Sequence, residues 1–214
     1  MGVNRKVPED DIPQDFINIL FKSDIAAEVD RWVIGKVLDS LASKLASNPD
    51  TQLFINISPK SFSDEAFLPW LTHALQQSKL PPNAVIFQFR EIDALRCLNQ
   101  AAAISNEMKK VSGQIAIANL GIAINPLKTL ERVDVDFVKI DRLIIEDLQQ
   151  GGEGKTKFQA LMAGMTSTGV DVIVPFVEKA SILPILWQQG VQYIQGHYVQ
   201  KPSFEMDYDF SEYS

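Results

Sequence analysis

The sequence predicts an α/β protein built on a parallel sheet, and two observations carry that prediction. Six short runs rich in β-branched and aromatic residues are spaced along the chain, and segments with helical periodicity separate most of them. Strands that are joined by helices pair in parallel through right-handed crossovers. A (β/α)8 barrel has eight strands, so six is two short of one, and a doubly wound open sheet is the rival architecture on pattern alone.

The first part of the chain has two expected helices before its first strand. Residues 1–12 form a proline-containing lead-in, and helical spacing begins at 14–22 and continues over 26–46. The longer helix has an apolar stripe that includes Trp32, Leu38 and Leu41, which indicates core packing.

Strands and helices then alternate regularly. A strand over 52–57 ends at Ser58-Pro59, Asp64 can cap a helix that runs to about Lys79, and Asn119-Leu120-Gly121 is expected as a turn. The further strands are expected over 84–89, 114–118, 135–140, 171–174 and 191–194, and the further helices over 92–111, 126–131, 142–150, 157–168 and 180–189.

Length, net charge and cysteine content limit the kinds of protein and partner that the sequence can represent. The 214 residues are enough to bury the core of a single domain over 1–214, with 203–214 as a C-terminal tail. The net charge of −7 opposes binding to polynucleotides, which usually needs a basic face. No apolar run approaches the roughly 20 residues of a membrane helix, so no membrane insertion is expected. The one cysteine, Cys97, is expected as a small core residue and fits a reducing cytoplasm.

Polar and unusual residues gather at the carboxyl ends of the predicted strands. A lone lysine such as Lys139 more commonly reaches the surface, but here the other strand ends carry candidate residues too. In a parallel barrel these ends converge on one face, where such barrels bind their ligands. The strand ends are Asn56, Gln88, Ala118-Asn119, Lys139, Pro175-Phe176 and Gln195.

Three of these segments resemble the motifs of one family. Residues 54–59 (FINISP), 138–141 (VKID) and 193–196 (YIQG) are similar to the NxSP, KID and QG motifs of EAL domains, bacterial phosphodiesterases of cyclic di-GMP. The resemblance covers about residues 12–202. It implies a TIM-like (β/α) barrel of the EAL type that lacks its first strands, and therefore an incomplete or open barrel.

An open barrel leaves two sheet edges, at 52–57 and 191–194, and exposed edges invite pairing with another chain. We expect the gap to be filled by a partner chain, by a second copy through self-association, or by the tail from 202 to 214. The alternative is that the sequence is a piece of a longer protein whose first strands it does not include.

The resemblance also implies that the metal site of the family is absent. Asn56, Lys139 and Gln195 match family site residues, and Glu178 matches the last glutamate of the EGVE motif. Gln88, Pro175 and the pair Ala118-Asn119 stand where active members have metal-binding carboxylates, and the glutamate of the EAL motif has no counterpart. Two Mg²⁺ or Mn²⁺ ions need such carboxylates. We therefore expect no divalent metal cofactor and no hydrolysis.

Phe176 suggests a receptor instead of an enzyme. It stands where active members usually have glycine, and residues 174–178 (VPFVE) resemble the FimX-like receptor subgroup of degenerate EAL domains. Its aromatic ring can stack on guanine, although a core-capping phenylalanine is the alternative. The resemblance implies a bacterial, cytoplasmic cyclic di-GMP receptor that acts through a PilZ-type adaptor in type IV pilus function. The alternative is a protein-interaction scaffold without nucleotide binding. The expected ligand-binding residues are Asn56, Gln88, Asn119, Lys139, Pro175, Phe176, Glu178, Gln195 and Gly196.

Overall fold

The computed structural model describes residues 19–20, 23–150 and 153–202. Ile19 and Leu20 are helical, and the rest of the helix predicted over 14–22 lies outside the described residues, as do the lead-in and the tail over 203–214. In the part that is described, no helix is both long and apolar enough to cross a membrane.

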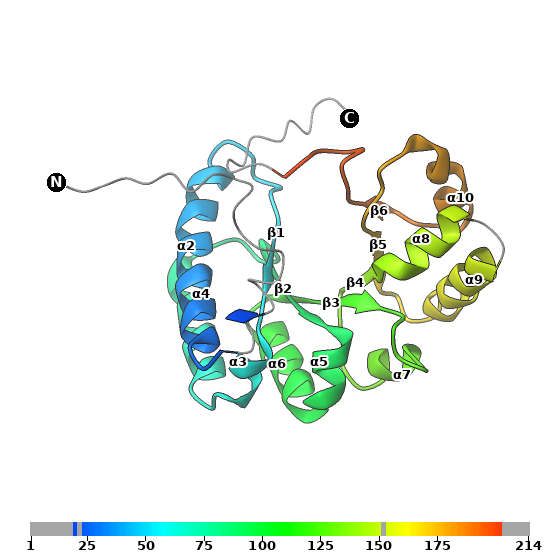
Figure 1. Cartoon of the computed structure of the whole chain (residues 1–214). Coiled ribbons are helices and arrows are strands. Elements are labelled where there is room, and N and C mark those ends of the chain that lie inside the picture. Colours follow the sequence, from blue (N-terminus) through cyan, green and yellow to red (C-terminus); the bar gives the residue numbers. More distant parts are fainter. Residues whose placement is uncertain (1–18, 21–22, 151–152, 203–214) are drawn as a thin grey trace.

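Six parallel strands form one sheet whose spatial order follows the chain, β1-β2-β3-β4-β5-β6. A doubly wound sheet would reverse its order at a switch point, so the sequential order excludes that rival. The sheet is curved, and the helices lie along its outer side (Figure 1). The strands are β1 (Leu53–Asn56), β2 (Val85–Arg90), β3 (Gln114–Leu120), β4 (Phe137–Ile140), β5 (Asp171–Val174) and β6 (Tyr193–Ile194).

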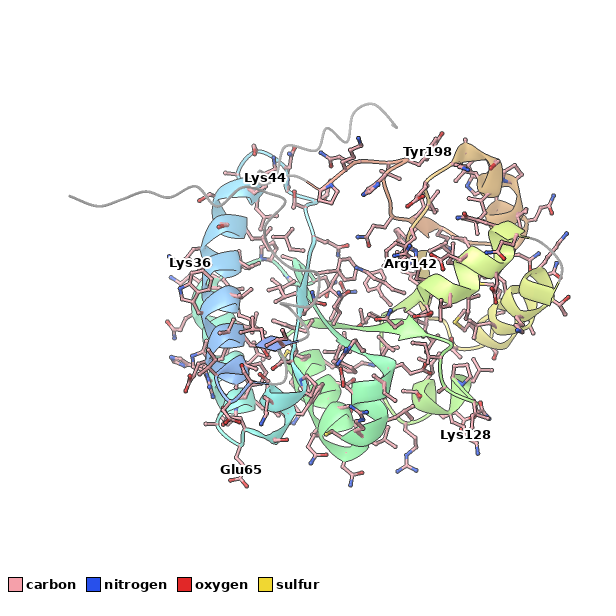
Figure 2. The ribbon with its side chains drawn as sticks, in the orientation of Figure 1. Lys36, Lys44, Glu65, Lys128, Arg142 and Tyr198 are labelled. Atoms are coloured by element: carbon pink, nitrogen blue, oxygen red, sulfur yellow. The ribbon has the colours of Figure 1, made fainter. Side chains whose placement is uncertain are left out.

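The helices fall close to their predicted positions. Charged side chains such as Lys36, Glu65 and Lys128 point away from the sheet (Figure 2). The helices are α2 (Ala26–Leu45), α3 (Pro59–Ser63), α4 (Phe67–Ser78), α5 (Glu91–Arg96), α6 (Leu98–Lys110), α7 (Leu127–Leu130), α8 (Arg142–Gln150), α9 (Glu153–Met165), the 3-10 turn η2 (Ala180–Ile182) and α10 (Leu183–Gln188).

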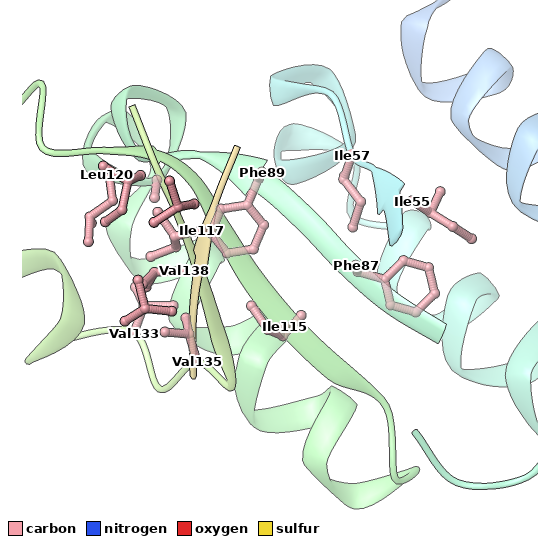
Figure 3. Close-up of a cluster of buried hydrophobic side chains, with 14 of the residues drawn as sticks. Ile55, Ile57, Phe87, Phe89, Ile115, Ile117, Leu120, Val133, Val135 and Val138 are labelled. Atoms are coloured by element: carbon pink, nitrogen blue, oxygen red, sulfur yellow. The ribbon is translucent and has the colours of Figure 1, made fainter. Parts of the chain in front are cut away.

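The main core lies between the outer face of the sheet and the helices. Successive strand side chains point to opposite faces, so every second strand residue meets the helical layer. Ile55, Phe87, Ile117 and Val138 are buried there (Figure 3). This burial of apolar area is the dominant favourable contribution to folding.

A second, smaller core fills the inner face. It consists of Ile86, Ala116, Phe137 and Ile173, with the partly buried Phe54 packed against them. The Phe137 ring makes edge contacts with Phe54 of β1 at 5.7 Å and with Tyr193 of β6 at 6.0 Å between ring centroids. The inner face is therefore packed by side chains from both ends of the sheet.

The two ends of the sheet are open edges among the described residues. β1 pairs only with β2, and β6 pairs only with β5. The six strands do not close into an eight-stranded barrel, which confirms the predicted open barrel.

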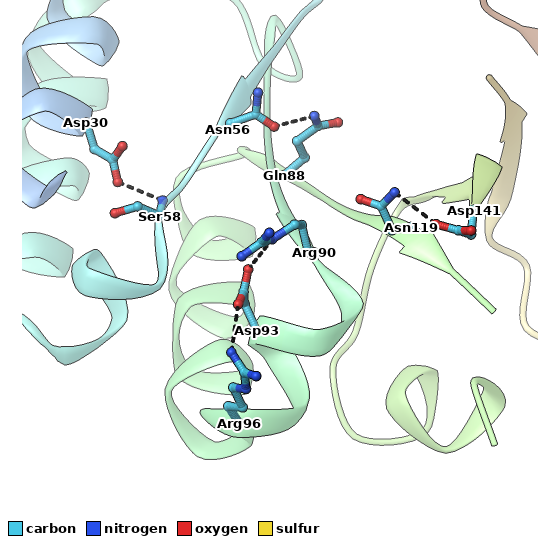
Figure 4. Close-up of polar contacts among 9 residues, drawn as sticks. All are labelled: Asp30, Asn56, Ser58, Gln88, Arg90, Asp93, Arg96, Asn119 and Asp141. Atoms are coloured by element: carbon cyan, nitrogen blue, oxygen red, sulfur yellow. Dashed lines mark hydrogen bonds and ion pairs between the residues drawn. The ribbon is translucent and has the colours of Figure 1, made fainter. Parts of the chain in front are cut away.

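Asp30 joins α2 to the segment that follows β1. Its Oδ2 atom accepts hydrogen bonds at 2.7 Å from the Ser58 backbone N–H and at 2.7 Å from the Ser61 hydroxyl (Figure 4). The carboxyl group is buried, so these two donors offset its loss of hydration. They also fix the chain directly after Asn56.

Two predictions about local structure are wrong. Trp32 is expected in the core but is 64% exposed. The buried face of α2 contains Asp30, Ile34 and Leu38. Trp32 lies two residues from Asp30 and two from Ile34, which places it on the opposite side of the helix. Asp64 does not cap α4, which begins at Phe67. Its Oδ1 instead accepts the Ala66 N–H, while Oδ2 pairs with Arg31.

Two further boundaries differ from the sequence pattern. The helix expected over 92–111 is broken at Cys97, whose φ of −129° and ψ of 48° are not helical. The strand expected to end at 118 continues to Leu120, with an irregular register after Ile117 and a φ of 56° at Asn119. Asn119 tolerates that left-handed backbone better than most residues. Cys97 itself is partly buried against the core, as expected.

Candidate functional site

A layer of site residues stands above the inner core at the carboxyl ends of the strands. Within strands, side chains two residues apart share a face, so each strand places one residue beyond its inner-core member. The alternation gives Asn56 after Phe54, Gln88 after Ile86, Ala118 after Ala116 and Lys139 after Phe137, while Pro175 and Gln195 directly follow the last residues of β5 and β6.

Asn56 and Gln88 are joined across β1 and β2. They are register partners, and the Gln88 side-chain N–H donates to the Asn56 Oδ1 at 2.5 Å (Figure 4). The Gln88 Oε1 atom is buried and has no hydrogen-bond partner among the described residues. A buried acceptor without a partner is costly, so this oxygen is suited to accept a hydrogen bond from a ligand.

Lys139 reaches across the inner face from β4 to β1. Its Nζ lies 4.0 Å from the centroid of the Phe54 ring, a cation–π contact. Burial lowers the pKa of the Lys139 ammonium group from its ordinary value to about 8, because desolvation disfavours the charged form. The prediction that Lys139 belongs to this face, and does not simply reach the surface, agrees with this position.

Asn119 orients the start of α8. Its side-chain N–H donates to Asp141 Oδ2 at 3.1 Å, and Asp141 Oδ1 accepts the Leu143 backbone N–H at 2.9 Å (Figure 4). The second bond is the contact of a helix N-cap. Asn119 therefore positions the β4–α8 junction, and its amide is not in contact with the Asn56–Gln88 pair in the structure.

Glu91 is a residue that the sequence reasoning did not single out. It is 1% exposed, and its Oε2 atom accepts the backbone N–H groups of Gly121, Ile122 and Ala123 at 3.0–3.1 Å. These three bonds hold the loop that follows β3 beside the site. The sequence does contain one indication of this role, which is the position of Glu91 directly after a predicted strand. In a parallel barrel, a carboxylate at that position lies on the ligand-binding face.

Phe176 is an exposed aromatic in an unusual backbone conformation. The residue is 43% exposed, and its φ is 59°, a left-handed value that bulky residues rarely adopt. The neighbouring Val177 is fully buried, and its N–H donates to the Gln195 carbonyl at 3.0 Å. Such strain costs about 1–3 kcal/mol and persists where the surroundings fix the backbone. The exposed ring does not fit the alternative of a phenylalanine that caps the core.

Gly196 owes its identity to a close approach between backbones. Its φ is 153°, and an added Cβ would lie closer than 3.0 Å to the backbone N, C and O atoms of Val177. The Tyr198 N–H also donates to the Val177 carbonyl at 3.0 Å. Gly196 thus allows the segment after β6 to pack closely against the backbone of the segment that contains Phe176.

The remaining predicted residues have fewer contacts. Pro175 is buried at the end of β5, whereas Gln195 and Glu178 are exposed. Within the described residues, Glu178 has no ion-pair partner and is not joined to the other predicted side chains. His197, in the segment after β6, and His73 on α4 are both exposed.

The donor set at the strand ends does not suit a divalent metal ion. Mg²⁺ and Mn²⁺ prefer carboxylate oxygens, and here the strand ends supply the amides of Asn56, Gln88 and Gln195 and the ammonium group of Lys139. Both oxygens of the nearby Asp141 carboxylate and the Oε2 atom of Glu91 accept N–H donors, while Glu91 Oε1 is buried without a hydrogen-bond partner among the described residues. In the part of the chain that the structure describes, no three His, Cys, Asp or Glu side chains could share a metal.

Comparison with known proteins identifies relatives of this arrangement. The model of the EAL domain family matches residues 5–202. A crystal structure of a FimX EAL domain is 38% identical in sequence, with a TM-score of 0.88 over 98% of this chain and 83% of that one. The FimX EAL domain from Pseudomonas aeruginosa, solved bound to c-di-GMP, is also 38% identical, with a TM-score of 0.84 over 92% of this chain and 79% of that one.

Curated relatives are more distant and much longer. The signaling protein YkoW of Bacillus subtilis is 22% identical over 89% of this chain and 24% of its own length. The cyclic di-GMP phosphodiesterase PdeF of Escherichia coli is 24% identical over 89% of this chain and 25% of its own length. The chain therefore spans about a quarter of the length of these relatives.

The close approach at Gly196 generates a stability prediction. Gly196→Ala should lower the free energy of unfolding by about 3 kcal/mol, because the new methyl group must displace backbone atoms of Val177. Gly190→Ala is the matched control, since Gly190 has a φ of 75° but no atom within 4 Å of an added Cβ. It should lose only about 1 kcal/mol. Urea unfolding midpoints measure both, and equal losses would contradict the close-approach explanation.

Proposed function

The chain belongs to the EAL domain family, and on that premise we propose that it is a cyclic di-GMP receptor that binds the dinucleotide without hydrolysing it. The observation that carries the proposal is the exposed, strained Phe176 at the mouth of the sheet, in a chain 38% identical to a FimX EAL domain solved with c-di-GMP bound. Strained residues cluster at ligand sites, and an exposed aromatic ring offers guanine a stacking surface.

The electrostatics of the strand-end layer favour an anionic ligand. Cyclic di-GMP carries two phosphate charges, and the layer presents the Lys139 ammonium group with the neutral amides of Asn56 and Gln88. A cation in a partly desolvated site attracts an anion more strongly than it would in water. The buried Gln88 oxygen can accept an N–H or O–H of the ligand. Binding in this way needs no divalent metal.

The same donor set argues against the phosphodiesterase reaction of active relatives. In two-metal hydrolysis, carboxylates fix both cations and the metals generate the attacking hydroxide. Gln88, Ala118, Asn119 and Pro175 offer no negative charge for that purpose. The ammonium group of Lys139 in the same layer would repel a cation.

A scaffold that does not bind nucleotide is the second candidate. The observation that favours it is the pair of open edges at β1 and β6. A closed barrel would have further strands between these edges, and the described strands do not supply that part of the ligand-binding face. Exposed edges are suited to pairing with another chain.

Two kinds of protein partner follow from these proposals. The FimX-like character supports a PilZ-type adaptor and a role in type IV pilus function in the bacterial cytoplasm. The free edges of β1 and β6 support self-association. Light scattering across a concentration series distinguishes them: self-association raises the mass of the protein alone, whereas an adaptor adds mass only when it is present.

Phe176 provides the direct test of nucleotide binding. In isothermal titration calorimetry with cyclic di-GMP, Phe176→Ala should weaken binding at least about tenfold, because it removes a stacking contact of roughly 1–3 kcal/mol. Phe176→Trp keeps a stacking ring and should retain affinity. Trp187→Ala removes an exposed aromatic ring on α10 and serves as the matched control. Unchanged affinity in Phe176→Ala, or loss of wild-type binding in EDTA, would refute this mode; no wild-type binding would favour the scaffold.

Hydrolysis is tested separately. Purified protein incubated with cyclic di-GMP and either Mg²⁺ or Mn²⁺ should produce no linear dinucleotide above a protein-free control, because the metal-binding carboxylates are missing. Chromatography of the nucleotides reads out the result. Turnover that grows in proportion to protein concentration would overturn the receptor-only proposal.

The pKa of Lys139 gives a pH dependence with a defined sign. Because this pKa is lowered to about 8, the ammonium charge is lost as the pH rises through 8. A bound phosphate raises the same pKa, so the dissociation constant for cyclic di-GMP should increase up to about tenfold between pH 7 and pH 9. Lys139→Met keeps an unbranched side chain without the charge, and it should bind more weakly at pH 7 with a flatter profile. Parallel profiles for the two proteins would contradict a role for the Lys139 charge.

A further inference from the structure

Arg142 lies against Phe176 at the edge of the site and was not among the predicted residues. Its Cζ atom is 5.2 Å from the centroid of the Phe176 ring. Its Nε donates to Glu146 Oε1 at 2.5 Å, one helical turn along α8. Arg142 stands at the first position of that helix, on the surface (Figure 2).

The backbone of Arg142 is held from both sides. Asp141, the residue before it, is buried and bonded to Asn119 and to the Leu143 N–H. The helix that follows is anchored by the buried Ile145 and Leu148. The guanidinium group therefore extends from a fixed point, and Glu146 restricts its direction.

Two donor groups of Arg142 remain available to a ligand. The Nε atom is bonded to Glu146, and the Nη groups have no hydrogen-bond partner among the described residues. The side chain is 59% exposed. A guanidinium group presents its N–H donors in a planar fork, which matches two acceptors side by side.

The Phe176 ring has room for a base with Arg142 in place. The guanidinium lies over the Phe176 ring with its Cζ atom 5.2 Å from the centroid, a cation–π contact that occupies part of one face of the ring. With Arg142 in this position, Phe176 is still 43% exposed. A flat ligand can therefore stack on Phe176 with one edge toward Arg142.

We propose that Arg142 is the residue that makes this site specific for guanine, by donating two hydrogen bonds to O6 and N7 of a base stacked on Phe176. Guanine presents these two acceptors side by side, whereas adenine replaces O6 with an amino donor that opposes the arginine donors. This proposal rests on the proposed cyclic di-GMP binding. In this proposal Phe176 stacks on the base, a contact that any base can make. Arg142 distinguishes guanine from the other bases.

The experiment compares two ligands that carry the same phosphates. Isothermal titration calorimetry with cyclic di-GMP and cyclic di-AMP is applied to the wild type, to Arg142→Lys and to Arg142→Met. Lysine keeps the charge without the planar fork. Arg142→Met should bind cyclic di-GMP about tenfold or more weakly and cyclic di-AMP as the wild type does, so discrimination between the ligands falls. Arg142→Lys should lose less, because lysine can still donate to O6 and N7. Arg132→Lys, an exposed arginine before β4 with no ion-pair partner among the described residues, is the matched control.

The possible outcomes separate this proposal from the function on which it rests. Equal loss for both ligands would assign Arg142 to a phosphate and overturn base recognition. Unchanged discrimination with intact wild-type binding would also overturn it, while the receptor function would stand. A wild type that binds neither ligand would overturn both. Circular dichroism melts of the variants, unchanged from the wild type, show that a loss of affinity does not come from unfolding.

Discussion

The contacts of Phe137 with the aromatic rings of both edge strands fix the curvature on which the rest of the structure depends. In a flat sheet, β1 and β4 would be separated by three strand spacings, about 14 Å. The Phe54 and Phe137 ring centroids are only 5.7 Å apart, and Tyr193 closes on Phe137 from β6 at 6.0 Å. Such distances require a curled sheet, and in an open barrel no closing strand pair supplies that curl. The inner-face packing supplies it instead.

This curvature also sets the electrostatics of the layer above. Lys139 lies two residues beyond Phe137, so the same bend brings its Nζ over the Phe54 ring, 4.0 Å from the centroid. There burial desolvates the ammonium group, and its pKa falls to about 8. A site whose charge is a partly buried cation among amides favours anions and disfavours metal cations. The packing of three aromatic rings thus bears directly on the class of ligand that the face can hold.

Much of the fold could be predicted because its signals are local. All six strands were located, since β-branched and aromatic runs mark buried parallel strands. The strand ends predicted that Asn56 and Gln88 share one face, and the hydrogen bond between them was seen only in the structure. Trp32 and Asp64 were misplaced because periodicity does not say which side of a helix meets the sheet or which partner a carboxylate finds. The roles of Glu91 and Arg142 depend on loops brought together by the fold. No local pattern encodes those contacts.

Phe176 shows how far the site depends on the edge of the sheet. Nothing in its own side chain favours a φ of 59°, so the conformation must be imposed by its neighbours. Val177 is buried beside it and receives the close approach of Gly196, while its backbone pairs with Gln195 and Tyr198. All of these partners belong to β6 or to the segment directly after it. The direction of the Phe176 ring is therefore fixed by an edge strand only two residues long, which among the described strands pairs only with β5, and by the segment after it. Any force that displaces that edge also displaces the ring against which Arg142 lies.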